Sequence, residues 1–159
     1  MYAFDVDGSE KRALYRDLLG ALDALTGDEP DPIANMANAA ALIWQYLPDL
    51  NWAGFYRLVG DTLVLGPFQG KPACIRIAIG SGVCGTAAAT LETQRVDDVE
   101  TFPGHIACDA DSRSELVVPI IRAGALIGVL DLDSPKAARF DGEDAAGVEA
   151  LAALLAARI

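Results

Sequence analysis

Apolar residues recur at helical spacing at both ends of the chain. Leucines stand three or four residues apart from Leu14 to Leu25, which predicts a helix that Ser9 caps and Gly27 ends. A second helix is expected to begin near Pro32 and to stop before Pro48. Its predicted inward face is Met36, Ala40, Ile43, Trp44 and Leu47. The last stretch, FDGEDAAGVEALAALLAARI, predicts an amphipathic helix that packs on the rest of the fold.

Between these helices the apolar period changes to two, which is typical of strands. The predicted strands are residues 51–59, 62–70, 74–80, 94–99, 115–122 and 125–134, with a short helix at 81–91. The dipeptides Gly60-Asp61 and Ala123-Gly124 predict hairpin turns, so neighbouring strands should be antiparallel. We therefore expect one α+β domain over residues 1–159, with a largely antiparallel sheet of about six strands covered by N- and C-terminal helices.

The charge of the chain limits its partners. Twelve basic and 23 acidic residues give a net charge of −11, which repels nucleic acid and anionic membrane surfaces. The sequence shows no signal peptide and no apolar run long enough to cross a bilayer, so we expect a cytoplasmic protein. Its three cysteines are too few for a disulfide scaffold and fit redox chemistry, metal binding or inert burial.

One motif resembles a dinucleotide fingerprint. Gly80, Gly82 and Gly85 follow a predicted strand and open the short helix, with the acidic pair Asp97-Asp98 beyond it. The acidic pair follows the last glycine at a shorter distance along the chain than the fingerprint requires. The hairpin-rich chain also does not fit a parallel nucleotide-binding sheet. These glycines are therefore expected to form the strand-to-helix turn, and the helix N-terminus could still bind a small anion such as a carboxylate.

Two metal sites can be considered from the ligand types. A Cys₃His zinc site would use Cys74, Cys84, His105 and Cys108, but only the last two have knuckle-like spacing. A calcium loop would start at Asp109 and Asp111, yet no glycine follows where the sharp turn needs one. A solvated acidic loop is the better interpretation of that segment.

Thiol redox chemistry is the third use of the cysteines. By local physics Cys84 is the best nucleophile, because the first turn of a helix stabilises a thiolate. Cys108 is disfavoured by Asp109 and Asp111, whose charges raise a thiol pKa, unless His105, Arg113 or a bound substrate offsets them. Cys74 stands at the head of a strand, within reach of a neighbouring loop.

Carboxylates and aromatic residues share faces of the predicted sheet. Asp131 and Asp133 project from one face of their strand. They either reach solvent at the strand end, or share a proton, bind a cation or meet a bound ammonium group. For Glu115, at the start of its strand, an exposed or capping position is likewise the alternative to a role in the active site. Trp52 and Tyr56 lie on one face of another strand, where they could pack a core or line a pocket.

Four stretches together resemble the free methionine-R-sulfoxide reductases, which are stand-alone GAF-type domains. They are NWAGFYRL, LGPFQGKPACIRIAIGSGVCGTAAAT, RVDDVETFPGHIACDADSRSELVVPI and GVLDLDSP. The resemblance implies a GAF fold and reduction of free methionine-R-sulfoxide by thiol chemistry, with no organic cofactor or metal. A GAF-type sensory module that binds a small ligand without catalysis is the alternative.

The resemblance also assigns roles to residues. Cys108 matches the catalytic cysteine, Cys74 the resolving cysteine and Cys84 a third thiol of less settled role. The matching carboxylates are Glu115, Asp131 and Asp133, and the aromatic wall is Trp52 and Tyr56. Backbone N–H groups of Gly82, Val83 and Cys84 are expected to hold the substrate carboxylate. A thioredoxin-type protein is the expected reductant, and a homodimer is the expected assembly.

Overall fold

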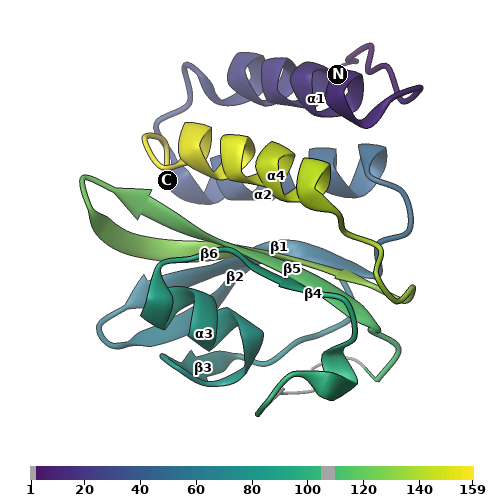
Figure 1. Ribbon diagram of the computed structural model, residues 1–159. Helices are drawn as coiled ribbons and strands as arrows, with labels where there is room; N and C mark the ends of the chain where they lie inside the picture. The colour runs from purple at the N-terminus through teal and green to yellow at the C-terminus, as the bar shows by residue number, and fades with distance from the viewer. Residues whose placement is uncertain (1–2, 105–109) are drawn as a thin grey trace.

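The computed structural model describes residues 3–104 and 110–159 (Figure 1). The helices are α1 (Lys11–Thr26), α2 (Pro32–Tyr46), α3 (Gly82–Thr90), the short 3₁₀ helix η1 (Val99–Thr101) and α4 (Gly142–Leu155). The strands are β1 (Trp52–Val59), β2 (Thr62–Gly70), β3 (Arg76–Ala78), β4 (Gln94–Val96), β5 (Ser114–Arg122) and β6 (Ala125–Ser134).

The strands form one six-stranded sheet in the order β3-β2-β1-β6-β5-β4, and every neighbouring pair is antiparallel. Helices α1, α2 and α4 lie on one side of the sheet, whereas α3 lies on the other (Figure 1). This arrangement confirms the α+β prediction. Hairpins join β1 to β2 and β5 to β6, as the two turn dipeptides predict.

Each face of the sheet has its own apolar core, because successive strand side chains point to opposite faces. Phe55, Leu130 and Leu132 pack with the three long helices. Trp52 and Tyr56 belong to the second cluster, beneath α3. The predicted division of β1 between two faces is therefore confirmed, and the aromatic pair stands on the face that α3 covers.

Helix α2 differs from its predicted inward face at one residue. Trp44 is 39% exposed, whereas Leu42 and Ile43 are buried. The reason is rotation, since each residue turns the helix by about 100° and Trp44 lies beyond the edge of the buried stripe. Asp31 caps this helix by accepting hydrogen bonds from the N–H groups of Ile33 and Ala34.

Some element ends also differ from prediction. Helix α1 begins after Glu10, which makes no side-chain capping bond, so Ser9 is not its cap. The strand expected at 94–99 stops at Val96, because Asp98 caps η1 through the N–H of Glu100. The strand expected at 74–80 covers only Arg76–Ala78. Within the described ranges, no helix has the length and apolar character needed to cross a membrane.

Candidate active site

The strand register brings three predicted site residues into one row. Trp52 on β1 pairs with Asp133 on β6, and Asp133 pairs in turn with Glu115 on β5. Asp131 lies two residues before Asp133 and therefore on the same face. Both Glu115 and Asp131 are buried, at 7% and 6% exposure. The alternative in which these carboxylates reach solvent at a strand end is wrong for both of them.

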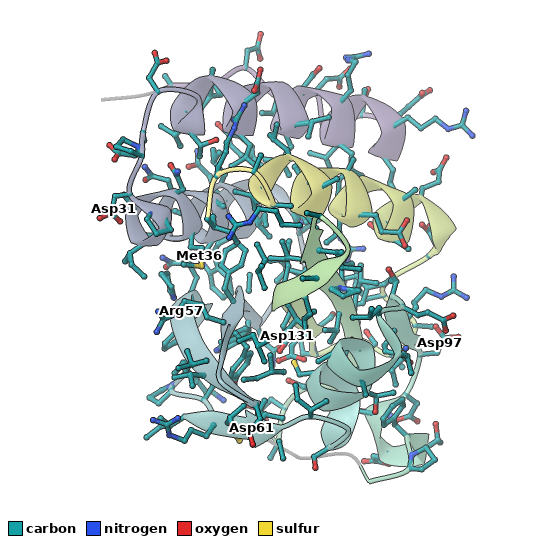
Figure 2. All side chains as sticks on the ribbon, turned by 90° about the vertical axis from the view of Figure 1, so that its left-hand side faces the viewer. Asp31, Met36, Arg57, Asp61, Asp97 and Asp131 are labelled. Atoms are coloured by element: carbon teal, nitrogen blue, oxygen red, sulfur yellow. The ribbon has the colours of Figure 1, made fainter. Side chains whose placement is uncertain are left out.

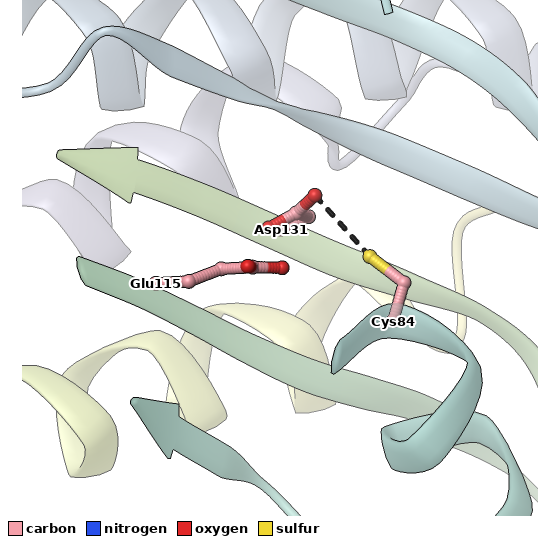
Figure 3. A group of neighbouring side chains, drawn as sticks. All are labelled: Cys84, Glu115 and Asp131. Carbon is pink, nitrogen blue, oxygen red and sulfur yellow. Dashed lines mark hydrogen bonds between the residues drawn. The ribbon is translucent and has the colours of Figure 1, made fainter. Parts of the chain in front are cut away.

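Helix α3 brings a thiol onto this row. Cys84 stands in its first turn, and its Sγ donates a hydrogen bond to Asp131 Oδ2 at 3.2 Å (Figure 3). The Glu115 carboxyl on the neighbouring strand interacts with the Asp131 carboxyl, which raises the pKa of Glu115 and lowers that of Asp131. The three side chains point toward one another, and one ligand-type atom of each lies within 4.8 Å of the others. Asp131 itself lies in the interior of the molecule (Figure 2).

Burial and mutual repulsion favour the protonated forms of the carboxyl groups in this cluster. Burial raises the pKa of Glu115 well above its usual value, and the charges of Asp131 and Asp133 raise it further. Burial also raises the pKa of Asp131 to about 7, although hydrogen bonds from Cys84 and Glu115 oppose that shift. Both shifts favour a protonated carboxyl group in this pair, because two buried carboxylates that lie so close repel each other.

The same environment makes Cys84 a poor nucleophile. Its side chain is 4% exposed. Burial raises the pKa of the thiol well above its usual value, and the negative charges of Asp131 and Glu115 add to this effect. The expectation that the helix dipole stabilises a thiolate at Cys84 is therefore wrong, because desolvation and two carboxyl groups outweigh the dipole.

An aromatic wall faces the carboxyl groups. The indole of Trp52 stacks on Phe68 and Tyr56, with ring centroids 5.2 Å and 5.9 Å away. Trp52 Nε1 donates a hydrogen bond to the carbonyl of Lys71 at 3.1 Å, and the Tyr56 hydroxyl donates one to the carbonyl of Cys74, also at 3.1 Å. The wall thereby fixes the backbone of the segment that follows β2.

Two glycines make room for the Trp52 ring. A Cβ at Gly54 would overlap Phe68 Cβ and lie 2.8 Å from Trp52 Cη2. A Cβ at Gly70 would lie 2.8 Å from Trp52 Cδ1, and the φ of Gly70 is +127°. The indole therefore fits only because neither position has a side chain.

These elements enclose a pocket of about 540 Å³, a volume that includes its solvent-filled mouth. Every residue predicted to bind substrate lines it: Trp52, Tyr56, Gly82, Val83, Cys84, Glu115, Asp131 and Asp133. Residues that sequence reasoning did not assign to the site also line it: Lys71, Pro72, Ala73, Ile77, Ser81 and Ser112. Most of these lie in irregular segments, where no periodicity indicates which way a side chain points.

The cysteines differ in their bonding state. Cys74 is disulfide-bonded, whereas Cys84 is the free cysteine among the described residues. A disulfide-bonded Cys74 offers no thiolate, so the Cys₃His zinc arrangement is not available in this state. Cys108 and His105 lie outside the described residues, and so does Asp109 of the calcium alternative. Asp111, its second acidic residue, forms an exposed ion pair with Lys71 at 2.6 Å.

The glycine motif serves the turn into α3. Gly80 and Gly82 have φ values of +88° and +63°, and a Cβ at Gly85 would overlap the carbonyl oxygen of Ala78 on β3. The Gly80 N–H donates to the Gly85 carbonyl at 2.8 Å. Because the sheet is antiparallel throughout, the dinucleotide-binding alternative is disfavoured.

Comparison with known proteins agrees with this geometry. The GAF domain family matches residues 31–159. The free methionine-R-sulfoxide reductase of Escherichia coli is 52% identical over 145 residues, covering 91% of this chain and 88% of that protein. The Saccharomyces cerevisiae protein of the same name is 46% identical over 153 residues, covering 91% of this chain and 85% of that protein.

A solved structure shows the same fold over almost the whole chain. The free methionine-R-sulfoxide reductase of Neisseria meningitidis, in complex with its substrate, superposes with a TM-score of 0.95 at 46% identity. The match covers 99% of this chain and 95% of that chain. The chain belongs to the free methionine-R-sulfoxide reductases, a family of GAF-domain oxidoreductases.

Proposed function

We propose that this protein, with residues 1–159 acting as one GAF domain, reduces free L-methionine-R-sulfoxide to L-methionine. The observation that carries the proposal is the burial of the Glu115 carboxyl beside Asp131, which raises its pKa, in a pocket that Trp52 also lines. A sulfoxide oxygen is a poor leaving group unless it is protonated, so its reduction needs a carboxylic acid that keeps its proton near pH 7.

The reaction that fits these groups begins with a thiolate. Cys108 attacks the sulfoxide sulfur while Glu115 gives its proton to the departing oxygen. The attack forms a bond between the Cys108 sulfur and the substrate sulfur, and the protonated oxygen leaves as hydroxide. Hydroxide then adds to the Cys108 sulfur, the sulfur–sulfur bond breaks with both of its electrons going to methionine, and Cys108 becomes a sulfenic acid. The substrate sulfur is thereby reduced by two electrons, which the cysteine supplies.

The pocket offers partners for both ends of a free amino acid. Asp131 Oδ1 is buried without a hydrogen-bond partner among the described residues, so it can accept a hydrogen bond from the substrate ammonium. The N–H groups of Gly82, Val83 and Cys84 stand in the first turn of α3, where a helix has no internal acceptor for them. Ser81 makes no side-chain capping bond there. A substrate carboxylate can therefore bind at this helix end.

Recycling requires a second thiol and an external reductant. We infer that Cys74 attacks the sulfenic acid, releases water and closes a disulfide with Cys108. The disulfide-bonded state of Cys74 supports a redox role for this residue. A thioredoxin-type dithiol protein then reduces the disulfide, which suits a cytoplasmic setting. A homodimer remains part of the proposal, and sedimentation analysis tests it.

The deciding experiment separates catalysis from ligand binding. The protein is mixed with dithiothreitol and each epimer of free methionine sulfoxide, and methionine is measured. The R epimer should be reduced and the S epimer should not. Binding of the R epimer without turnover would instead favour a sensory module.

Variants of the acid test its assignment. Glu115→Gln keeps the shape of the side chain but cannot supply the proton, so turnover should fall by roughly 10²- to 10⁴-fold. Glu92→Gln changes an exposed glutamate outside the pocket and serves as the matched control. Cys108→Ser should abolish methionine formation.

A further inference from the structure

We propose that Cys84, Glu115 and Asp131 form a binding site for one zinc ion, which competes with the substrate for the pocket. One sulfur and two carboxylate oxygens, one atom from each residue, lie within 4.8 Å of one another (Figure 3). All three side chains are buried and line the same pocket. The ion is not a resident cofactor, since the proposed reaction uses only thiols and carboxyl groups.

The spacing of the donors is close to that of a zinc site. Zinc–sulfur and zinc–oxygen bonds of about 2.3 Å and 2.1 Å at a tetrahedral angle separate the two donor atoms by roughly 3.6 Å. Cys84 Sγ and Asp131 Oδ2 are 3.2 Å apart. Small side-chain rotations on a rigid scaffold are therefore sufficient, because β5, β6 and the first turn of α3 already hold the three residues in place.

A separate observation indicates that the cluster can accept a ligand. Asp131 is 6% exposed, and its Oδ1 atom has no hydrogen-bond partner among the described residues. A buried carboxylate oxygen that is left unpaired costs free energy that a cation can recover. The site therefore has both a set of donors and an acceptor atom that protein groups do not satisfy.

The donor types select the metal. Thiolate sulfur favours zinc over magnesium and calcium, which prefer sites made only of oxygen. Three protein donors leave the fourth tetrahedral position to water, as in open zinc sites. When the ion binds, a zinc–sulfur bond replaces the sulfur–hydrogen bond of Cys84, and the proton leaves to solvent.

The functional consequence rests on the proposed reaction. A zinc ion on Glu115 and Asp131 would occupy the carboxyl group that protonates the sulfoxide and the oxygen that accepts the substrate ammonium. Zinc should therefore inhibit reduction competitively with respect to free methionine-R-sulfoxide, and the substrate should weaken zinc binding in the same proportion.

The test measures binding without relying on activity. The protein is used in its disulfide form, in which Cys84 is the free cysteine of the described part of the chain. It is titrated with Co²⁺ as a spectroscopic substitute for zinc. We expect one equivalent to bind with a near-ultraviolet thiolate-to-cobalt absorption band, and added Zn²⁺ should remove the band. Free methionine-R-sulfoxide should raise the apparent Kd for Co²⁺.

Variants show whether the three named residues are the ligands. Cys84→Ser should eliminate the band, and Glu115→Gln and Asp131→Asn should each weaken binding by at least about tenfold. Asp61→Asn, an exposed aspartate in the β1–β2 turn, should leave the affinity unchanged. Three results would each contradict the proposed zinc site. They are the absence of the band, a band that remains in Cys84→Ser, and an affinity for Co²⁺ that neither carboxyl variant changes. Binding without inhibition would instead count against the proposed catalytic role of Glu115.

Discussion

The Tyr56 hydroxyl donates a hydrogen bond to the backbone carbonyl of Cys74 at 3.1 Å. The ring of Tyr56 lines the pocket while its hydroxyl reaches the neighbouring segment. One side chain thus contacts both the space for the substrate and the backbone of the proposed resolving cysteine. This relationship connects the aromatic wall to the second half of the proposed reaction.

Replacing Tyr56 with phenylalanine should affect the two halves of the reaction differently. The ring remains, so the first round of methionine formation should change little. Loss of one hydrogen bond, worth about 0.5–1.5 kcal/mol, should slow disulfide formation at Cys74 by roughly 2- to 10-fold. Quenched single-turnover assays with pre-reduced protein can follow methionine and remaining thiols separately.

Tyr46→Phe is the matched control for that variant. The Tyr46 hydroxyl also donates to a backbone carbonyl, that of Phe4, at 3.0 Å, but far from the pocket. Tyr46→Phe should therefore leave the rates of methionine formation and of disulfide formation unchanged. If Tyr56→Phe slowed methionine formation and disulfide formation equally, the hydroxyl would have no separate effect on Cys74.

Stability should depend on pH through Asp131. Burial raises the pKa of Asp131 from 3.8 to about 7, so between about pH 4 and pH 7 the folded protein keeps a proton that the unfolded chain releases. The contribution of this proton is complete below pH 4 and is lost as the pH rises to 7. The Asp131 proton alone should therefore lower the free energy of unfolding by up to about 1.4 kcal/mol per pH unit in this window, and the raised pKa of Glu115 acts in the same direction.

The Asp131→Asn variant provides the comparison. Asparagine does not titrate, so urea unfolding at pH 5 and pH 7.5 should show a smaller loss of stability for the variant than for the wild type. Parallel pH profiles for the two proteins would show that Asp131 ionises with an ordinary pKa.

Cys84 should resist alkylation in the folded protein. Its thiol is buried, has a raised pKa and donates to Asp131, and alkylation needs an accessible thiolate. In the disulfide form at pH 7.5, iodoacetamide should modify Cys84 at least about tenfold more slowly than in guanidinium chloride. Mass spectrometry of tryptic peptides measures this rate, and equal rates in the two conditions would contradict the described burial.

The space that Gly54 and Gly70 leave for the Trp52 ring should not tolerate an added methyl group. Gly54→Ala would place a Cβ against Phe68 and Trp52, so we expect a loss of roughly 1–3 kcal/mol of unfolding free energy. Gly20→Ala is the control, since a Cβ there meets nothing within 4 Å and Gly20 lies inside α1. It should be neutral or stabilising by up to about 1 kcal/mol. Urea unfolding measures the free energy of unfolding of both variants. Equal changes in the two variants would mean that the structure around Trp52 can adjust to a Cβ at Gly54.

Much of the fold could be predicted from the sequence, because hydrophobic periodicity is a local property. The period of two placed Trp52 and Tyr56 on one face of β1 and Phe55 on the other. It also placed Asp131 and Asp133 together on β6. The order of hairpins and helices was sufficient to predict an antiparallel sheet with helical cover.

The properties of the site depended on contacts between distant segments. The local sequence predicted that Cys84 is the most reactive thiol. Only the packing of α3 against β5 and β6 placed Glu115 and Asp131 around it. A pKa depends on desolvation and on charges within a few ångströms, and neither is encoded by neighbours along the chain. The sequence alone thus determined which faces carry the acidic and aromatic residues, whereas tertiary structure decided that the pKa of Glu115 is raised and that Cys84 is shielded.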